Sequence, residues 1–149
     1  VCSSDLYMEP PARFEAGTQP VAQVVAAGVA AEWMMGVGMA NIEAHERTIA
    51  AELLKLGDID GVRILGPREN VNRIGTVAFD VAGVHPHDVG QFIDAQGIAI
   101  RVGHHCAQPV HRHFGLYASN RASSGVYNSV DDARALVEAV AKVRPFFKA

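Results

Sequence analysis

The sequence predicts an α+β fold: a small mixed β-sheet packed by helices, with two connecting helices before it. Apolar residues recur first with helical spacing and then with strand-like spacing, and the predicted order of elements is ααββαββα. The 149 residues suit a single domain, and a content of 49% hydrophobic and 19% charged residues is enough for a core. Two cysteines are too few for a disulfide framework, which favours a reducing, cytoplasmic setting.

The first half of the chain predicts two helices followed by two strands. Pro20 suits the first turn of a helix that runs to about residue 35, where the sequence Gly-Val-Gly ends it. Asn41 is the predicted N-cap of a second helix, which stops at Gly57. Strands are expected over residues 62–65 and 74–81.

The middle of the chain predicts a short helix, a strand and an irregular segment. Asp88 is the predicted cap of a helix that runs to Gly97, and residues 98–102 form an apolar strand. Residues 103–120 follow neither period, so we expect a long loop or a broken short helix there.

A fourth strand and a last helix are expected near the C-terminus. The strand is predicted over residues 123–127. Ser129 and Asp132 have the spacing of a capping box, and Pro145 is the predicted end of the helix that follows.

The first six residues look foreign to the rest. They spell Val-Cys-Ser-Ser-Asp-Leu, which the 3′ end of a common sequencing-library adapter encodes in one frame. We therefore expect residues 1–6 to be non-native, residues 7–57 to be a lead-in with connecting helices, and residues 58–149 to be a C-terminal α+β domain.

Charge and hydropathy argue against two classes of partner. The 13 basic and 16 acidic residues give a net charge of −3, so no basic surplus is available to neutralise a nucleic-acid backbone. Residues 21–42 carry a single charge, Glu32, but they are rich in Ala and Gly and have no basic flank, which favours a buried helix pair over a membrane span.

The irregular segment is where chemistry is expected. It holds Cys106 together with four of the seven histidines, namely His104, His105, His111 and His113. Only a thiolate is a good nucleophile, and Arg101, His104 and His105 are the cations that could favour it. From composition alone, a buried and inert cysteine is the simpler interpretation. A second alternative is a non-catalytic metal-binding or interaction module, in which Cys106 with His111 or His113 supplies two or three zinc ligands, although the spacing fits no standard pattern.

Several motifs resemble one enzyme family. Residues 101–109 spell Arg-Val-Gly-His-His-Cys-Ala-Gln-Pro, followed by Arg-Ala-Ser at 121–123 and Tyr-Asn at 127–128. Residues 13–18 spell Arg-Phe-Glu-Ala-Gly-Thr. In this order, the motifs resemble the C-terminal part of SufS-type (group II) cysteine desulfurases, which belong to the aminotransferase class V family of fold-type I pyridoxal-phosphate enzymes. Ser124 and Gly125 stand where Phe and Ala are commoner in that family.

The resemblance implies a function and roles for particular residues. Such enzymes take sulfur from L-cysteine as an enzyme persulfide and release L-alanine, for iron–sulfur cluster assembly in the cytoplasm. Cys106 occupies the position of the nucleophile and Arg121 that of the group that binds the substrate carboxylate. Arg101 is a second substrate-binding residue by the same resemblance. Arg101 and His105 flank the nucleophile and would tune it or organise its loop, to which His104 also belongs.

The resemblance also implies a cofactor and partners. Gly17 and Thr18 match the segment that reaches the phosphate of pyridoxal 5′-phosphate in the other subunit of a homodimer, although a simple helix cap would also account for them. His87 resembles the histidine that exchanges with a zinc ligand of a SufU-type sulfur acceptor. Two alternatives remain: the acceptor is of SufE type, or His87 is simply a solvated loop residue. The cofactor-anchoring lysine belongs to a large domain that this chain lacks, so we expect an inactive fragment with no metal site. Its only lysines are Lys55, Lys142 and Lys148.

Overall fold

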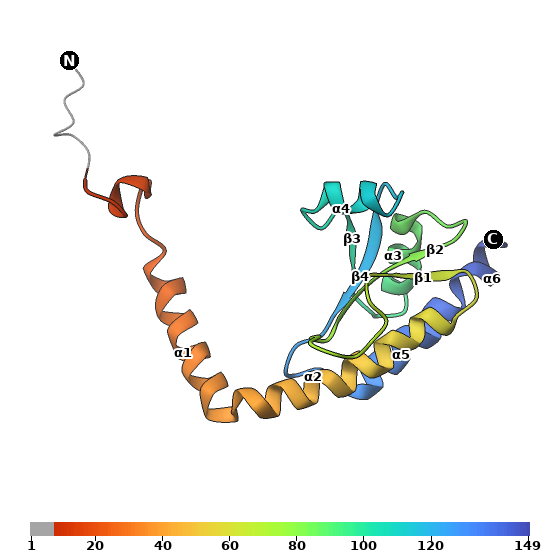
Figure 1. Cartoon of the computed structure of the whole chain (residues 1–149), viewed down its shortest axis with the longest axis horizontal. Helices are drawn as coiled ribbons and strands as arrows, with labels where there is room; N and C mark the ends of the chain where they lie inside the picture. Colours follow the sequence, from red (N-terminus) through yellow and green to blue (C-terminus); the bar gives the residue numbers. More distant parts are fainter. Residues whose placement is uncertain (1–7) are drawn as a thin grey trace, which may run out of the picture. The chain divides into compact units, whose positions relative to one another are not determined.

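The computed structural model describes residues 8–149, which form two compact units that divide between Met39 and Ala40 (Figure 1). The expectation that residues 1–6 are non-native lies outside the described residues. The larger unit starts well before the expected domain boundary at residue 57, because Ile49 and Leu53 of the second helix belong to its core.

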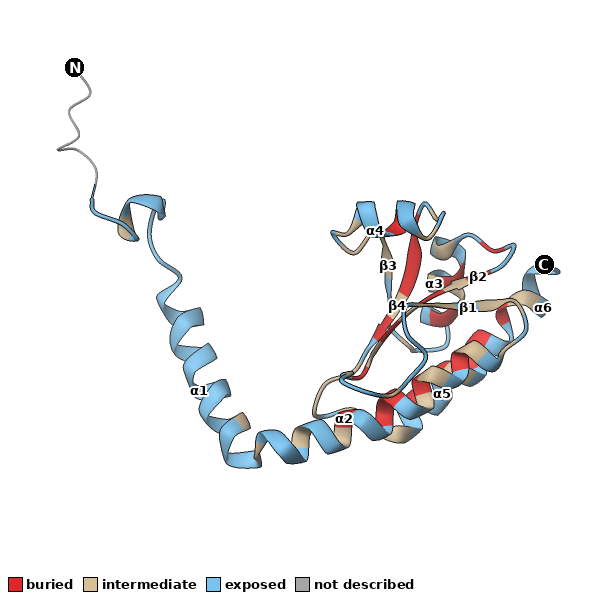
Figure 2. Cartoon of the chain, in the orientation of Figure 1, coloured by how far each residue is buried: buried red, intermediate tan, exposed pale blue. Residues whose placement is uncertain are grey.

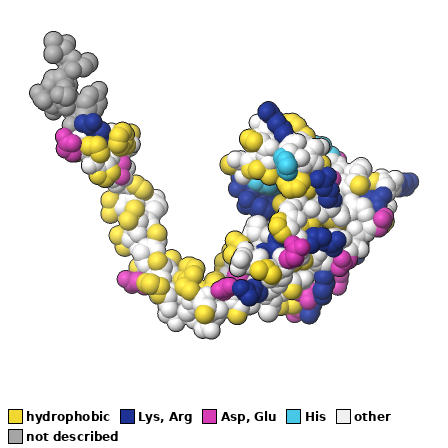
Figure 3. Space-filling model, viewed as in Figure 1, with side chains coloured by type: hydrophobic (Ala, Val, Ile, Leu, Met, Phe, Trp, Pro, Cys, Tyr) yellow, Lys and Arg dark blue, Asp and Glu magenta, His cyan; other side chains and the backbone are white. Residues whose placement is uncertain are grey.

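The first unit contains a single 3₁₀ turn, η2 (Ala12–Phe14), and helix α1 (Val21–Val37). No residue of α1 is buried, and its large apolar side chains, such as Trp33, lie exposed along it (Figure 3). The helix ends as predicted: Gly38 adopts a φ of 93° and its N–H donates to the Met34 carbonyl at 3.0 Å. Among residues 8–149, no single helix is long and apolar enough to cross a membrane, and only α1 taken together with the next helix meets that test.

The second unit is built on a four-stranded sheet in the order β1-β2-β4-β3. All three pairings are antiparallel, so the sheet is not mixed as expected. The reason is that β4 lies between β2 and β3, which run in the same direction but do not pair. The strands are β1 (Val62–Leu65), β2 (Thr76–Val81), β3 (Arg101–Gly103) and β4 (Ser119–Ser123).

One face of the sheet holds the core. Alternate β2 residues, Val77, Phe79 and Val81, are buried and pack with apolar residues of the helices, as the burial colours show (Figure 2). The helices concerned are α2 (Met39–Leu54), α3 (Pro86–Asp94) and α5 (Val130–Ala141), with the short η3 (Lys55–Asp58) after α2. In α2 the buried stripe has the spacing of an amphipathic helix: Glu46, Ile49, Ala50 and Leu53.

The opposite face of the sheet carries arginines beside apolar residues and is partly covered by a short helix. The registers align Leu65, Ala78, Arg121 and Arg101 in one row across the four strands. Paired residues of antiparallel strands project to the same side, so this row lies on one face. A short helix, α4 (Gln108–His113), contacts that face through a hydrogen bond between His111 and Ser119.

Several predicted boundaries differ from the structure. The third strand, predicted over residues 98–102, is Arg101–Gly103, and the fourth starts at Ser119 instead of residue 123. Helix α4 is the broken short helix that was expected within residues 103–120. The last residues of that segment, just before Arg121, belong to strand β4 although they are polar. Pro145 does not end α5; it lies in the first turn of α6 (Val143–Phe147), where its missing N–H costs nothing.

The predicted helix caps are partly confirmed. Ser129 and Asp132 form the predicted capping box at the start of α5. The cap of α3 is His85 and not Asp88: its ring Nδ1 accepts a hydrogen bond from the His87 backbone N–H at 3.2 Å. Helix α2 begins at Met39, two residues before the predicted Asn41 cap.

Candidate functional site

Cys106 lies in a tight loop that we call the cysteine loop (residues 103–107). Gly103, the last residue of β3, has a φ of 120°, and His105 and Cys106 follow with φ of 53° and 58°. Left-handed backbone is unfavourable for residues with a side chain and is found at functional sites where the surroundings enforce it. Here the Ala107 N–H donates to the His104 carbonyl at 2.8 Å and closes the turn. The loop presents Cys106 as a free, exposed cysteine, so the buried and inert alternative does not hold.

Two arginines stand beside this loop on neighbouring strands. Arg101 of β3 and Arg121 of β4 are direct partners in the sheet register. The Arg101 Nη2 lies 4.0 Å from the Cys106 Sγ. Arg121 is half-buried, and its buried Nε has no hydrogen-bond partner in the described part of the chain. The site therefore combines a thiol with two cationic groups suited to a carboxylate.

A pair of histidines meets on one serine. His105 Nε2 lies 3.1 Å from the Ser119 Oγ, and His111 Nε2 lies 2.9 Å from the same oxygen. Ser119 is fully buried, and His111 nearly so. Burial lowers the pKa of His105 below its ordinary value, and the charge of Arg121 lowers it further, so His105 is neutral near pH 7.

His104 does not contact Ser119 in this way. Its ring packs edge-on against Tyr117, with the two centroids 4.8 Å apart, and also approaches His111. This packing holds the start of the cysteine loop against the residues that precede β4.

A cavity of about 250 Å³ opens on the face of the sheet opposite the core. The cavity is bounded by His105 and Ala107, the sequence neighbours of Cys106, and by His111, Ser119 and Arg121. An apolar wall faces these polar groups. The complete lining is Leu65, Ala78, His105, Ala107, Val110, His111, Phe114, Ser119 and Arg121.

The structure does not bring all the predicted site residues together. Cys106, Arg101, Arg121, His104 and His105 gather around the cysteine loop. Gly17 and Thr18 belong to the first unit, where both are exposed, and Gly17 adopts a φ of 75°. The N-cap of α1 is Pro20 and not Thr18. His87 is exposed on the first turn of α3 and borders a different pocket.

The residues of this site fit a carboxylate and a nucleophilic thiol, but not the covalent anchor of pyridoxal phosphate. Lys55 lies on η3 and forms an ion pair with Glu52, Lys142 caps α5, and Lys148 follows α6. None of these lysines lines the cavity. Nor do residues 8–149 contain any group of three or more His, Cys, Asp or Glu side chains placed to hold a metal ion.

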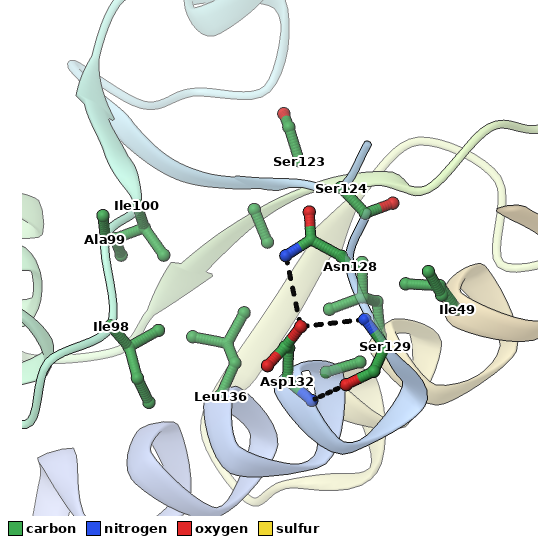
Figure 4. A pocket seen from close by; sticks show the side chains of 13 residues that line it. Ile49, Ile98, Ala99, Ile100, Ser123, Ser124, Asn128, Ser129, Asp132 and Leu136 are labelled. Atoms are coloured by element: carbon green, nitrogen blue, oxygen red, sulfur yellow. Dashed lines mark hydrogen bonds between the residues drawn. The ribbon is translucent and has the colours of Figure 1, made fainter. Parts of the chain in front are cut away.

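A second pocket, at the start of α5, is structural in character (Figure 4). Its polar groups bond to one another: Asp132 accepts from the Ser129 N–H at 2.8 Å and from the Asn128 side chain at 3.3 Å. These hydrogen bonds lower the pKa of Asp132, the one from the Ser129 backbone most. Because the bonds complete the capping box, they leave little polar capacity for a ligand.

Ser119 and His111 are the residues that sequence reasoning missed as parts of one site. His111 entered only as a possible zinc ligand, and Ser119 lay in the segment without a pattern. Their spacing of eight residues carries no motif, because the contact depends on how α4 folds back on β4.

Comparisons with known proteins point in one direction. Residues 2–136 match the family model described as Aminotransferase class-V. Over 145 residues the chain is 50% identical to a protein of Mycobacterium leprae named "Probable cysteine desulfurase 2", covering 97% of this chain and 35% of that protein. A "Probable cysteine desulfurase" of Streptomyces coelicolor is 43% identical, again over 97% of this chain and 35% of the relative. The chain spans about a third of the length of these relatives.

Solved structures agree in fold. The apo cysteine desulfurase of Thermococcus onnurineus NA1 superposes with a TM-score of 0.82 at 34% identity, over 93% of this chain and 35% of that one. The cysteine desulfurase CsdA of Escherichia coli, described as an S-sulfonic acid form, gives a TM-score of 0.77 at 33% identity, over 91% of this chain and 33% of that one.

Proposed function

Because the chain belongs to the aminotransferase class V family, we propose that it is the part of a cysteine desulfurase that carries the sulfur-accepting cysteine. The complete protein takes sulfur from L-cysteine as a persulfide on Cys106 and releases L-alanine. We place it with the SufS-type (group II) enzymes, which act in iron–sulfur cluster assembly in the cytoplasm. Its relatives named cysteine desulfurase support the general activity.

One observation carries the proposal: an exposed thiol stands on a strained loop at the rim of a cavity that holds a half-buried arginine. Cys106 adopts a φ of 58°, and both of its sequence neighbours, His105 and Ala107, line the cavity together with Arg121. A small amino acid bound by its carboxylate to Arg121 would place its side chain near the loop. An inert structural cysteine needs neither feature.

The residues divide the work by their chemistry. The planar guanidinium of Arg121 binds both oxygens of the substrate carboxylate. Arg101, whose Nη2 lies 4.0 Å from the Cys106 Sγ, flanks the nucleophile and contributes to binding the substrate carboxylate. His104 and His105 hold the cysteine loop through the contacts to Tyr117 and Ser119.

The sulfur-transfer step belongs to Cys106. Its thiolate attacks the sulfur of L-cysteine, an S–S bond forms and the C–S bond breaks. The electron pair stays on carbon, which takes up a proton to give alanine. In the complete protein, pyridoxal 5′-phosphate, anchored by a lysine outside this chain, supplies the electron sink.

The remaining roles concern partners. We propose that Gly17 and Thr18 contact the cofactor phosphate of the other subunit in a homodimer. We further propose that His87, exposed on α3, serves the sulfur acceptor, of SufU type in preference to SufE type.

The test uses the complete enzyme, restored with the residues beyond this chain. Alanine release from L-cysteine is measured for the wild type and for Cys106→Ser, with His113→Ala as a surface control on α4. The proposal expects release by the wild type and the control only. Equal release by Cys106→Ser would contradict it.

A further inference from the structure

Three side chains form a hydrogen-bonded chain that ends on a backbone carbonyl. His105 Nε2 lies 3.1 Å from Ser119 Oγ, and that oxygen lies 2.9 Å from His111 Nε2. The other ring nitrogen of His111, Nδ1, lies 3.0 Å from the Ala107 carbonyl oxygen. The first residue of this hydrogen-bonded chain, His105, and its last acceptor, the Ala107 carbonyl, therefore both belong to the cysteine loop.

The direction of each hydrogen bond follows from its fixed end. A carbonyl only accepts, so His111 Nδ1 carries a proton. In a neutral imidazole the other nitrogen is then bare, so His111 Nε2 accepts the Ser119 hydroxyl proton. Ser119 has one proton to donate and must accept from its other neighbour. The proton between them therefore lies on His105 Nε2.

At the end of this hydrogen-bonded chain, one ring nitrogen of His105, Nδ1, is still to be accounted for. With its proton on Nε2, a neutral His105 has a bare Nδ1, and this buried atom has no hydrogen-bond partner in the described part of the protein. His105 lines the same cavity as Arg121. A buried acceptor without a partner is costly unless something else satisfies it.

We propose that Ser119 and His111 are positioning residues that hold His105 as its Nε2–H tautomer, so that Nδ1 accepts a hydrogen bond from the ligand of the cavity. For L-cysteine, the groups with a proton to give are the α-ammonium and the thiol; this identification of the ligand rests on the proposed function. The tautomer itself does not depend on which ligand binds.

The tautomer is measured by long-range ¹H–¹⁵N NMR on the 149-residue chain, because bare and protonated imidazole nitrogens have well-separated ¹⁵N shifts. His105→Gln and His111→Gln identify the two ring systems by the signals that they remove. The proposal expects a protonated Nε2 on His105 and a protonated Nδ1 on His111. A protonated Nδ1 on His105, or a His111 ring protonated on both nitrogens, would overturn it. The wild-type rings are also assigned through correlations from their own backbone signals, so the result stands even if a variant fails to fold.

Variants at Ser119 separate positioning from simple packing. Ser119→Ala removes the hydroxyl, and the ratio of the Nε2–H to the Nδ1–H form of His105 should fall about fivefold to tenfold, as expected for one lost hydrogen bond. Ser119→Thr keeps the hydroxyl and should restore the ratio. Ser123→Ala on the same strand is the matched control and should leave it unchanged. An unchanged ratio in Ser119→Ala, or no rescue by Ser119→Thr, would contradict the proposal.

Kinetics of the complete enzyme then connect the tautomer to the ligand. Ser119→Ala should raise KM for L-cysteine by about fivefold to tenfold, and Ser119→Thr should return it to the wild-type value. An enzyme without activity on L-cysteine would refute the proposed function and leave the NMR result standing. An active enzyme with the same KM in Ser119→Ala would refute the role of the tautomer alone.

Discussion

Arg101 and Arg121 face each other directly across the pairing of β3 with β4, on the face of the sheet opposite the core. Like charges in directly opposite positions destabilise a sheet. A bound carboxylate between or beside the two guanidiniums relieves that repulsion, which explains why two cations are placed next to a cavity and a free thiol. The pair is thus better suited to binding an anion than to stabilising the strands.

Replacing Arg121 by lysine should weaken substrate binding in the complete enzyme. An ammonium cannot reproduce the two parallel hydrogen bonds of a guanidinium, so KM for L-cysteine should rise by about tenfold or more. Steady-state kinetics test this, with Arg112→Lys on the exposed side of α4 as the control. A KM in Arg121→Lys equal to that of the control would rule out the carboxylate contact.

The 149-residue chain by itself should not desulfurate L-cysteine. None of its three lysines lines the cavity, so the cofactor has no covalent anchor at this site. Alanine and sulfide release are measured with added pyridoxal phosphate. Release faster than with free pyridoxal phosphate alone would show that this expectation is wrong.

His87→Ala should abolish stimulation of the complete enzyme by a zinc-loaded SufU-type acceptor. Neutral imidazole is a good zinc ligand, and His87 is exposed at the start of α3. The persulfide on Cys106 should still form, because His87 borders a different pocket from the cysteine loop. His113→Ala controls for loss of a surface histidine.

Two results would count against this role for His87. One is normal stimulation of His87→Ala by the zinc-loaded acceptor. The other is equal stimulation of the wild type by a zinc-free SufE-type acceptor.

Glu46→Ala should destabilise the larger unit much more than Glu43→Ala on the same helix. The buried Glu46 carboxylate accepts from the Gly75 N–H at 2.6 Å and from the Ser124 hydroxyl at 2.9 Å, which ties α2 to the ends of β2 and β4. Leaving these donors without an acceptor should cost about 2–3 kcal/mol of unfolding free energy. The exposed Glu43–Arg47 ion pair should be worth less than about 1 kcal/mol. Urea unfolding measures both, and equal midpoints would refute the tie.

Stability should fall on acidification through His105. Burial lowers the pKa of His105 in the folded state, whereas its pKa in the unfolded chain is about 6.5. As the pH drops below about 6.5, the unfolded chain therefore binds more protons than the folded chain. The free energy of unfolding should therefore decrease from pH 7.5 to pH 5.5. His105→Gln removes this contribution, so its urea midpoint should depend less on pH than that of the wild type. Parallel pH profiles would show that the folded pKa is not lowered.

Elements with one clear period could be predicted from the sequence. The second helix, the second strand and the capping box at Ser129 all follow local rules, and the structure contains all three, as α2, β2 and the start of α5. Cys106 and Arg121 were recognised through motifs. Arg121 lines the cavity and Cys106 lies between two residues that line it, but their roles remain proposals. The exposed thiol follows from backbone angles at His105 and Cys106 that composition alone does not predict.

Elements that depend on tertiary contacts could not be predicted. Strand β4 begins with Ser119 and Asn120, both fully buried although polar, so no apolar alternation marks it. The serine–histidine chain likewise exists only because α4 folds back on β4. The Ser124 hydroxyl donates a hydrogen bond to the distant Glu46, a contact that no local sequence pattern indicates.

Cys106 is the proposed acceptor of the sulfur, and the mass of its peptide tests this role most directly. The complete enzyme is mixed with L-cysteine without an acceptor, alkylated, digested and analysed by mass spectrometry, with Cys106→Ser treated alike. We expect one additional sulfur atom on Cys106 in the wild type and none at position 106 in the variant. Alanine formation with Cys106 left unmodified, or persulfide found on another cysteine at the same yield, would contradict it.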